Sequence, residues 1–254
     1  MRRVKVRISE EATSKKRDKV VIEEAEDTRK LQLALLRKIR QHATAPVDKY
    51  GCEQLGRLSN TEKGFRFYVL VALLLSSQTR DEIVGAAVSR LHHIGLSPAS
   101  IQGLDENVLA DLIKPVGFYK KKAIYLRRIC EILIEKYEGD IPNNYHDLCA
   151  LPGIGPKMAY LAMAHAWNNP VGIGVDVHVH RIANRLKWVD TLHKSTDHTR
   201  MELENIIPKR FWPEINPLLV GFGQEICRPT KPLCHLCDLQ ALCPSAFAKG
   251  NKKV

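Results

Sequence analysis

Apolar residues recur at helical spacing along almost all of this 254-residue chain, and this periodicity narrows the fold class more than any other feature. Leu31, Leu35 and Ile39 mark one helical face, and residues 61–77 read as a largely apolar helix with Thr61 as a candidate N-cap. Turn residues separate such segments at short intervals, while period-two alternation is confined to residues 171–180. The sequence therefore predicts an all-α protein of about ten helices without a β-sheet.

The length of the chain allows one large domain or two small lobes with hydrophobic cores. Residues 168–174, NNPVGIG, have the composition of a crossing between two helical lobes. Residues 1–28 mix both charge signs and contain no aromatic side chain, so they can bury little apolar surface. We therefore expect a flexible charged tail over residues 1–28.

The balance of charge favours an anionic partner. Lys and Arg number 39 against 28 Asp and Glu, which gives a net charge of +11. Nucleic acid is a better candidate than a membrane surface, although charge alone fits a merely soluble basic protein equally well. No apolar run approaches the roughly 18 residues of a membrane span, and the first 30 residues lack the apolar core of a signal peptide. Residues 15–17, KKR, are a candidate nuclear-import patch or simply a solvated cluster.

Four of the seven cysteines crowd into the C-terminal part of the chain with the spacing Cys-x6-Cys-x2-Cys-x5-Cys. Such a density indicates a metal site in a reducing compartment rather than a disulfide framework. The candidates are tetrahedral zinc and a four-iron cubane, and the presence of only one Cys-x2-Cys pair favours the cubane. Cys52, Cys130 and Cys149 are most simply small core residues. The expected metal ligands are Cys227, Cys234, Cys237 and Cys243.

A glycine-rich hairpin, LPGIG at residues 151–155, joins two helical segments. Gly153 and Gly155 permit backbone angles closed to other residues and let the backbone approach another surface. The helix that follows directs its unpaired N–H groups and its positive dipole end to the same point, which favours an anion. On a basic chain the natural anion is a DNA phosphate, whereas the plainer reading is a tight corner between helices.

Two charged residues near the hairpin are candidates for chemistry. Lys157 has apolar neighbours and lies in the first turn of a helix, and both features disfavour its charged form. An uncharged lysine amine is a nucleophile that can form a Schiff base, although a lysine there could simply grip a phosphate. Asp176 precedes the next helical pattern, so we expect it to be an N-cap whose carboxylate faces a developing cation.

The ordered combination of the LPGIG hairpin, Lys157, the VDVH segment at 175–178 and the four-cysteine spacing resembles the endonuclease III family. These are helix-hairpin-helix DNA glycosylases with a [4Fe-4S] cluster. The resemblance covers roughly residues 30–247, and residues 44–55 resemble eukaryotic members. It implies two helical lobes with a DNA cleft between them. One is a six-helix barrel-like lobe at 59–169 with the helix-hairpin-helix at about 145–167. The other comprises residues 29–58 and 170–247 and carries the cluster loop 227–243.

The resemblance also implies a bifunctional DNA N-glycosylase and AP lyase of base excision repair. Its substrates would be oxidised pyrimidines of the thymine glycol type in double-stranded DNA. Lys157 matches the Schiff-base lysine and Asp176 the catalytic aspartate. Gln78 matches the side chain that fills the gap left by the extruded base, and Phe118 matches a wedge beside the opposite strand. The other positions expected to contact DNA are Ser76, Asp81, Gly153, Gly155, His178 and Lys231.

Three rival readings explain less of the sequence. A mismatch adenine glycosylase would lack a lysine at position 157 and would carry a further C-terminal domain. Only about ten residues follow Cys243 in this sequence, so we expect no such domain. A non-catalytic helix-hairpin-helix module, or an iron–sulfur electron carrier, accounts for neither Lys157 nor Asp176.

One position departs from the family pattern. Bacterial members often have a basic residue where this sequence has Pro156, but proline suits the first turn of a helix. We expect a monomer in the nucleus, with the mitochondrion left open and no membrane association.

Overall fold

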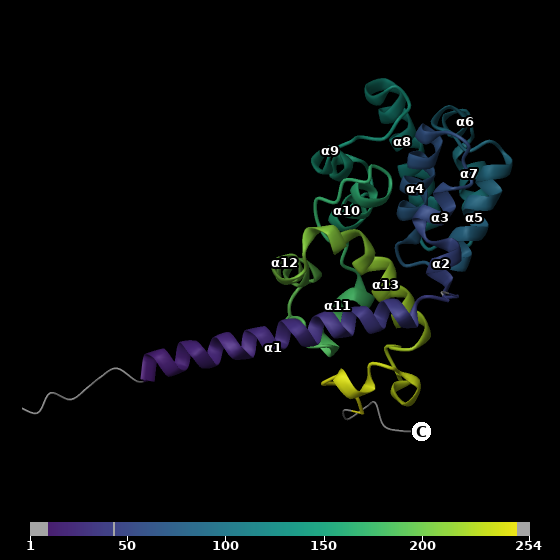
Figure 1. Cartoon of the computed structure of the whole chain (residues 1–254). Coiled ribbons are helices and arrows are strands. Elements are labelled where there is room, and N and C mark those ends of the chain that lie inside the picture. Colours follow the sequence, from purple (N-terminus) through teal and green to yellow (C-terminus); the bar gives the residue numbers. More distant parts are fainter. Residues whose placement is uncertain (1–9, 43, 248–254) are drawn as a thin grey trace, which may run out of the picture.

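A computed structural model describes residues 10–42 and 44–247 of the chain (Figure 1). Within these ranges it contains thirteen α-helices and three short 3-10 helices, and no strand, so the all-α prediction is confirmed. The number of helices exceeds the expected ten because several are single turns, which periodicity cannot reveal. These are α2 (Pro46–Tyr50), α3 (Cys52–Gly56) and α6 (Pro98–Gln102). No helix in the described part of the chain is long and apolar enough to cross a membrane.

Helix α4 (Glu62–Ser76) forms the centre of the first hydrophobic cluster. Nine consecutive residues, Phe67 to Leu75, are buried, as expected for a helix covered on all sides. Thr61 Oγ1 accepts a hydrogen bond from Gly64 N at 3.1 Å, which confirms the predicted N-cap. The helices packed around α4 are α3, α5 (Asp81–His93), α8 (Tyr119–Tyr137) and α10 (Pro156–His165).

The remaining helices of this cluster are α6, α7 (Glu106–Ile113) and α9 (Tyr145–Ala150), and α9 precedes the hairpin. The predicted boundary at residues 58 and 59 needs adjustment. Leu55 and Cys52 belong to the first cluster, although we assigned residues 29–58 to the other lobe. The physical reason is that α3 packs its apolar side directly on α4.

The second hydrophobic cluster joins segments far apart in the sequence (Figure 1). Its helices are α1 (Glu10–Ile39), α11 (Val177–Arg185), α12 (Thr196–Ile206) and α13 (Trp212–Glu225), with η1 (Lys209–Phe211) before α13. Arg40 cross-links three of the elements, because its guanidinium donates to Asp48 in α2 and to Glu225 at the end of α13. A Cβ at Gly221 would lie 2.1 Å from Arg40, so glycine is needed for α13 to pass this side chain.

The expected flexible tail over residues 1–28 is wrong where the structure describes it. Residues 10–28 form the first part of α1, and residues 1–9 lie outside the described residues. Low hydropathy argues against burial but not against a solvated helix, because Glu, Lys, Arg and Ala are good helix formers. An ion pair between Lys30 and Glu26 at 2.9 Å, four residues apart, adds local support.

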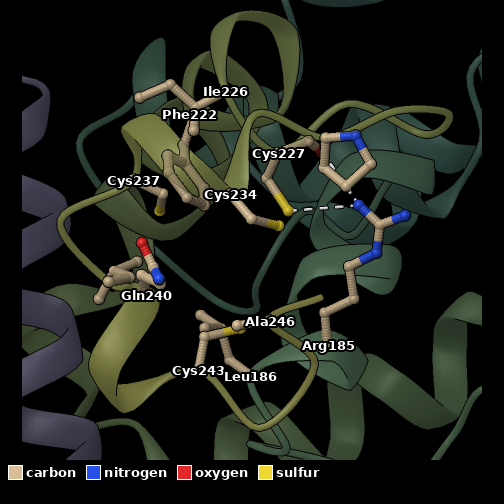
Figure 2. Close-up of a pocket in the computed structure, with 12 residues that line it drawn as sticks. Arg185, Leu186, Phe222, Ile226, Cys227, Cys234, Cys237, Gln240, Cys243 and Ala246 are labelled. Atoms are coloured by element: carbon tan, nitrogen blue, oxygen red, sulfur yellow. Dashed lines mark hydrogen bonds between the residues drawn. The ribbon is translucent and has the colours of Figure 1, made fainter. Parts of the chain in front are cut away.

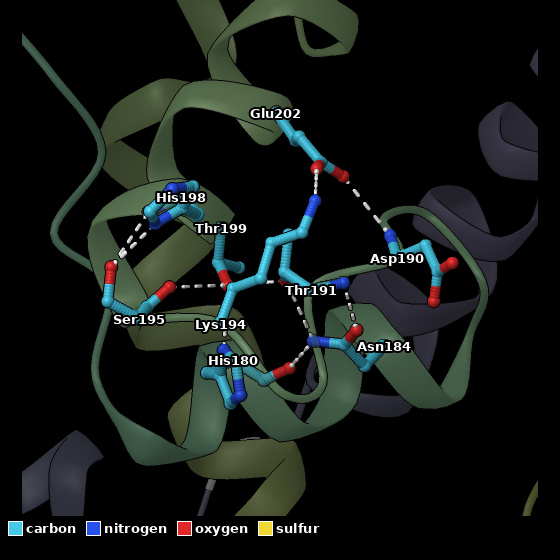
Figure 3. Close-up of polar contacts among 9 residues, drawn as sticks. All are labelled: His180, Asn184, Asp190, Thr191, Lys194, Ser195, His198, Thr199 and Glu202. Atoms are coloured by element: carbon cyan, nitrogen blue, oxygen red, sulfur yellow. Dashed lines mark hydrogen bonds and ion pairs between the residues drawn. The ribbon is translucent and has the colours of Figure 1, made fainter.

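A buried polar network holds α11 against α12 (Figure 3). Asn184 Nδ2 donates to Thr191 Oγ1 at 3.1 Å, and Thr191 N donates to Asn184 Oδ1 at 2.8 Å. The hydroxyls of Thr191 and Thr199 are 2.6 Å apart, and His180 Nδ1 lies 2.7 Å from Thr199 Oγ1. Hydrogen bonds of this kind fix one relative placement of the two helices, and with it the position of the α11 N-terminus.

Candidate active site

A cleft of about 1110 Å³ is lined by residues from both hydrophobic clusters. Its walls come from the α2–α3 segment, the end of α4, the starts of α5 and α11, and one side each of α10 and α13. Lys157 and Asp176 both line it. The structure therefore brings the two residues that the sequence singled out for chemistry into one cavity.

Asp176 is the N-cap of α11, as predicted. Its Oδ1 accepts hydrogen bonds from His178 N and Val179 N, both at 2.9 Å. The side chain is half-buried at the wall of the cleft. Because two backbone donors hold one oxygen, the orientation of the carboxylate is fixed by the start of the helix.

Lys157 is the second residue of α10 and is half-buried. The electrostatics of His178 show which groups lie nearby. Burial lowers the pKa of His178, and the cations of Arg181 and Lys157 act in the same direction, while Asp176 and Asp81 oppose them. The lysine, two carboxylates and the imidazole therefore share one electrostatic environment within the cleft.

The segment after α4 supplies further lining residues. Ser76 Oγ donates to Leu73 O at 2.9 Å, and Asp81 Oδ2 accepts from Gln224 Nε2 at 2.8 Å. Burial raises the pKa of Asp81, against the opposing effects of the Gln224 hydrogen bond and the nearby Lys157. Between Ser76 and Asp81 in the sequence, Gln78 is exposed and lines the cleft, and its φ of 51 lies in the left-handed region.

The two hairpin glycines play different structural parts. Gly153 has φ +78, and a Cβ there would lie 2.4 Å from the Tyr125 ring, so the fold itself demands glycine. The expectation of special backbone angles is wrong for Gly155, which has φ −103 and ψ 175 as N-cap of α10. A Cβ at Gly155 would meet nothing within 4 Å. The absent side chain therefore leaves open surface at the start of α10.

Four expected DNA contacts lie outside the cleft lining, namely the hairpin glycines Gly153 and Gly155, and Phe118 and Lys231. Phe118 is 64% exposed with φ 55 and immediately precedes α8. Its loop adjoins that of Gln78, since Gly117 N donates to Thr79 Oγ1 at 3.0 Å. Lys231 is exposed with φ 50, and the residues just before it, 228–230, do line the cleft.

The four C-terminal cysteines surround a separate cavity of about 30 Å³ (Figure 2). The loop has little regular structure beyond η2 (Cys234–Leu236) and η3 (Gln240–Leu242). Arg185 Nη1 donates to Cys227 Sγ at 3.3 Å and to Arg228 O at 2.7 Å, which ties the loop to α11. All four cysteines are free. Their side chains are not placed, among the described residues, as a group able to hold a single metal ion. Four thiols around one cavity are nevertheless the donor type that an iron–sulfur cluster requires.

Sequence reasoning missed a group of cleft residues from α3. Glu53 Oε2 lies 3.2 Å from His165 Nδ1, and both line the cleft beside Cys52. The hydrogen bond from His165, followed by one from Arg57, lowers the pKa of Glu53 to about 2 against the effect of burial. Burial raises the pKa of Cys52 to about 12, so its thiol is protonated at neutral pH. No local sequence pattern predicts these residues, because α3 is a single turn whose partners lie far along the chain.

Cys130, outside the cleft, is fully buried, as predicted.

An all-helical frame that presents a lysine after a glycine hairpin and a helix-capping aspartate in one cleft is the arrangement that the sequence motifs predicted for a base excision DNA repair protein. The chain belongs to the HhH-GPD superfamily of base excision DNA repair proteins, whose family model matches residues 71–209. Within that superfamily it falls with the endonuclease III proteins, as the sequence motifs indicated.

The relatives support this placement. The chain is 50% identical over 223 residues to endonuclease III homolog 1, chloroplastic, of Arabidopsis thaliana, covering 85% of this chain and 58% of the relative. It is 49% identical over 215 residues to endonuclease III-like protein 1 of Mus musculus, covering 85% and 72%. A solved non-covalent endonuclease III–DNA complex superposes with a TM-score of 0.74 at 27% identity, covering 89% of this chain and 99% of that one. This chain therefore spans 58% of the plant relative and most of the mouse relative.

Proposed function

We propose that this protein is a bifunctional DNA N-glycosylase and AP lyase that removes oxidised pyrimidines of the thymine glycol type. It would cleave the strand 3′ to the resulting abasic site by β-elimination. The observation that carries the proposal is that Lys157 and Asp176, which belong to helices of different hydrophobic clusters, line one cleft. A net charge of +11 and the solved DNA complex of a relative support double-stranded DNA as the substrate.

The chemistry follows from the two side chains. A duplex hides the glycosidic carbon, so the damaged nucleotide must leave the stack at a cost of a few kcal/mol. As the bond from C1′ to the base breaks, positive charge develops on the sugar, and the fixed carboxylate of Asp176 stabilises it. Lys157 Nζ bonds to C1′ as the bond to the base breaks, and the base departs with a proton. The C1′–O4′ bond of the sugar ring then breaks, O4′ takes up a proton, and C1′ and Nζ become joined as an imine. The imine acidifies the C2′–H bond, whose proton is lost as the 3′-phosphate leaves.

The surroundings supply the DNA contacts. Gln78 and Phe118 would occupy the space vacated by the extruded nucleotide, and Ser76 and Asp81 would line the pocket that receives its base. The open surface at Gly155, next to the positive end of α10, would accept a backbone phosphate. The further residues proposed to contact DNA are Gly153, His178, Arg228 and Lys231.

We further propose that the four cysteines at 227, 234, 237 and 243 hold a [4Fe-4S] cluster. Their arrangement around one cavity fits this group, which would supply covalent cross-links to a loop of little regular structure. Pro229 and Thr230 of that loop line the DNA cleft. A cross-linked loop would therefore hold the cleft wall in place.

We place the protein, as a monomer, in the nucleus where this substrate occurs, and keep the mitochondrion as the alternative. The candidate import residues 15–17 belong to α1, and the structure does not describe their side chains. A fluorescent fusion of the full chain, with and without a charge-reversed 15–17 segment, would test the proposal. Nuclear exclusion of the unaltered fusion would contradict it.

Borohydride trapping on a thymine glycol duplex tests the proposed mechanism. The unaltered protein is expected to nick the strand and to form a covalent adduct after reduction. Lys157→Gln should still bind the duplex but give neither nicking nor adduct, because the amide cannot form an imine. Lys136→Gln, at an exposed lysine near the end of α8, removes the same charge elsewhere and should behave as the unaltered protein. An adduct that persists in Lys157→Gln would rule this lysine out.

A further inference from the structure

Lys122 is a buried cation in the first turn of α8 that the mechanism above does not use. Its residue is only 4% exposed, in a lobe whose core is otherwise apolar. The ammonium donates three hydrogen bonds, to Leu75 O at 2.8 Å, Ser77 O at 2.7 Å and Thr79 Oγ1 at 3.4 Å. Burying an ammonium is costly, and these acceptors are uncharged, so the arrangement calls for an explanation.

The acceptors locate what the lysine holds. Leu75 and Ser77 belong to the last turn and C-cap of α4, where backbone carbonyls lack helical partners and a cation is favourable. The next residue, Gln78, takes the left-handed conformation with φ 51. Lys122 thus fixes the point at which the chain leaves α4 and turns Gln78 toward the cleft.

Thr79 extends the same connection to a second loop. Its hydroxyl accepts from Lys122 Nζ and from Gly117 N, and donates to Ser77 O at 3.2 Å. The two loops also touch through their backbones, since a Cβ at Gly117 would lie 2.6 Å from Gln78 O. One hydroxyl therefore links the loop of Gln78 to the loop that continues into Phe118.

Phe118 is a further residue that Lys122 contacts through a hydrogen bond. It also takes the left-handed conformation, with φ 55, and its carbonyl accepts from Lys122 N at 3.0 Å. Residues other than glycine persist in this region only where their surroundings hold them there. Lys122 thus contacts both loops, through its side chain on one and its backbone on the other.

We infer that Lys122 and Thr79 are positioning residues that lock the loops of Gln78 and Phe118 into one rigid wedge for nucleotide extrusion. This inference rests on the proposed function, because it takes the wedge role of Gln78 and Phe118 from it. A duplex tends to restack, and a loop that had to become ordered on binding would lose part of the contact energy in that ordering. A wedge held in its working shape before binding avoids that loss.

The test compares Thr79→Val with Thr79→Ser. Valine keeps the shape but removes the hydroxyl, while serine keeps the hydroxyl. The substrate is a duplex with 2-aminopurine next to thymine glycol, whose fluorescence reports unstacking. We expect Thr79→Val to slow both extrusion and single-turnover base removal by on the order of tenfold to a hundredfold. Cleavage of a preformed abasic site, where there is no base to extrude, should be unchanged, and Thr79→Ser should restore extrusion.

Lys122→Met and Gln78→Ala complete the experiment. Lys122→Met should slow the same step. Combining Thr79→Val with Gln78→Ala should slow it by less than the product of the two single effects, because part of the hydroxyl's effect acts through Gln78. If Gln78→Ala is slow but Thr79→Val is not, the coupling is wrong and the wedge role stands. If Gln78→Ala extrudes normally, the wedge role in the proposed function is wrong, and the inference fails with it. Equal slowing on lesion and abasic substrates would also overturn it.

Discussion

The two lobes reach stability by different routes. The first is built around α4, whose nine consecutive buried residues pack on four other helices. Apolar packing therefore dominates its order, although Arg66 also donates two hydrogen bonds to Asp140. The second has a smaller apolar cluster and is closed by polar cross-links. Its links include the Arg40 ion pairs, the network around Thr199 and the contacts of Arg185 with the cysteine loop.

The difference follows from chain topology. The first lobe is a nearly continuous stretch, whereas the second brings the later part of α1 together with the C-terminal part of the chain (Figure 1). Gln32 shows how: its Nε2 donates to Leu242 O at 2.8 Å, and its Oε1 accepts from Trp188 Nε1 at 2.6 Å. Joining distant segments costs loop entropy before any contact forms, so specific cross-links matter more there. Each lobe then supplies one of the two proposed catalytic groups, Lys157 from the first and Asp176 from the second.

Loss of one proposed cysteine ligand should reveal the difference in stability between the two lobes most clearly. We expect Cys243→Ser to abolish the visible absorbance of the proposed cluster and to lower the free energy of unfolding by on the order of 4 kcal/mol, as for loss of a structural metal. Hydrogen exchange should show faster opening of α11 and α13, while α4 stays protected. Cys149→Ser, at a partly buried cysteine of the first lobe, is the control. Equal loss of protection in α4 would contradict the division.

The catalytic role proposed for Asp176 can be tested without destabilising the second lobe. Asn caps helices about as well as Asp, so Asp176→Asn should leave the melting temperature nearly unchanged. Base removal should fall about 10²–10³-fold, because a fixed charge at the developing oxocarbenium is lost. Single-turnover kinetics beside calorimetry would measure both. A large drop in melting temperature would mean that the charge itself holds α11, and the rate could not then be read as catalysis.

Local sequence signals were sufficient for much of this site. Thr61 and Asp176 were predicted as helix N-caps because capping depends on residues adjacent in the sequence. The four cysteines were predicted to lie in one loop because they are close together in the sequence. The pairing of Asp81 with Gln224 joins residues 143 positions apart and leaves no periodic trace. The same holds for Lys122, which in the sequence is one of three consecutive lysines that either contact phosphate or lie at a solvated helix end. Its burial is visible only once α4 and α8 are packed together.

A substitution in the polar network of Figure 3 tests whether hydrogen bonds, in addition to apolar packing, stabilise the second lobe. Thr199→Val removes the hydroxyl that meets Thr191 and His180 while keeping the side-chain shape. We expect the free energy of unfolding to fall by about 1–3 kcal/mol, since buried partners lose their hydrogen bonds. Urea titration would measure it, with Thr196→Val as an exposed control on the same helix. A loss no larger than the control's would show that the network adds little.

The buried cation of the first lobe gives the subtlest test, because it is the exception to that lobe's apolar character. Burial lowers the pKa of Lys122 to about 8 from its ordinary 10.5. Between these values the unfolded chain binds a proton at this site that the folded chain has released, so stability should rise with pH in that window. Below about pH 8 both states are protonated and the full cost of burying the charge remains. The free energy of unfolding, relative to Lys122→Met, should therefore increase from pH 8 to 10 by no more than about 1.4 kcal/mol per pH unit, the limit for one proton. A difference that is flat or falls with pH would show that the three oxygen acceptors keep the ammonium charged. The cation would then strengthen the first lobe in the same polar way that Arg40 strengthens the second.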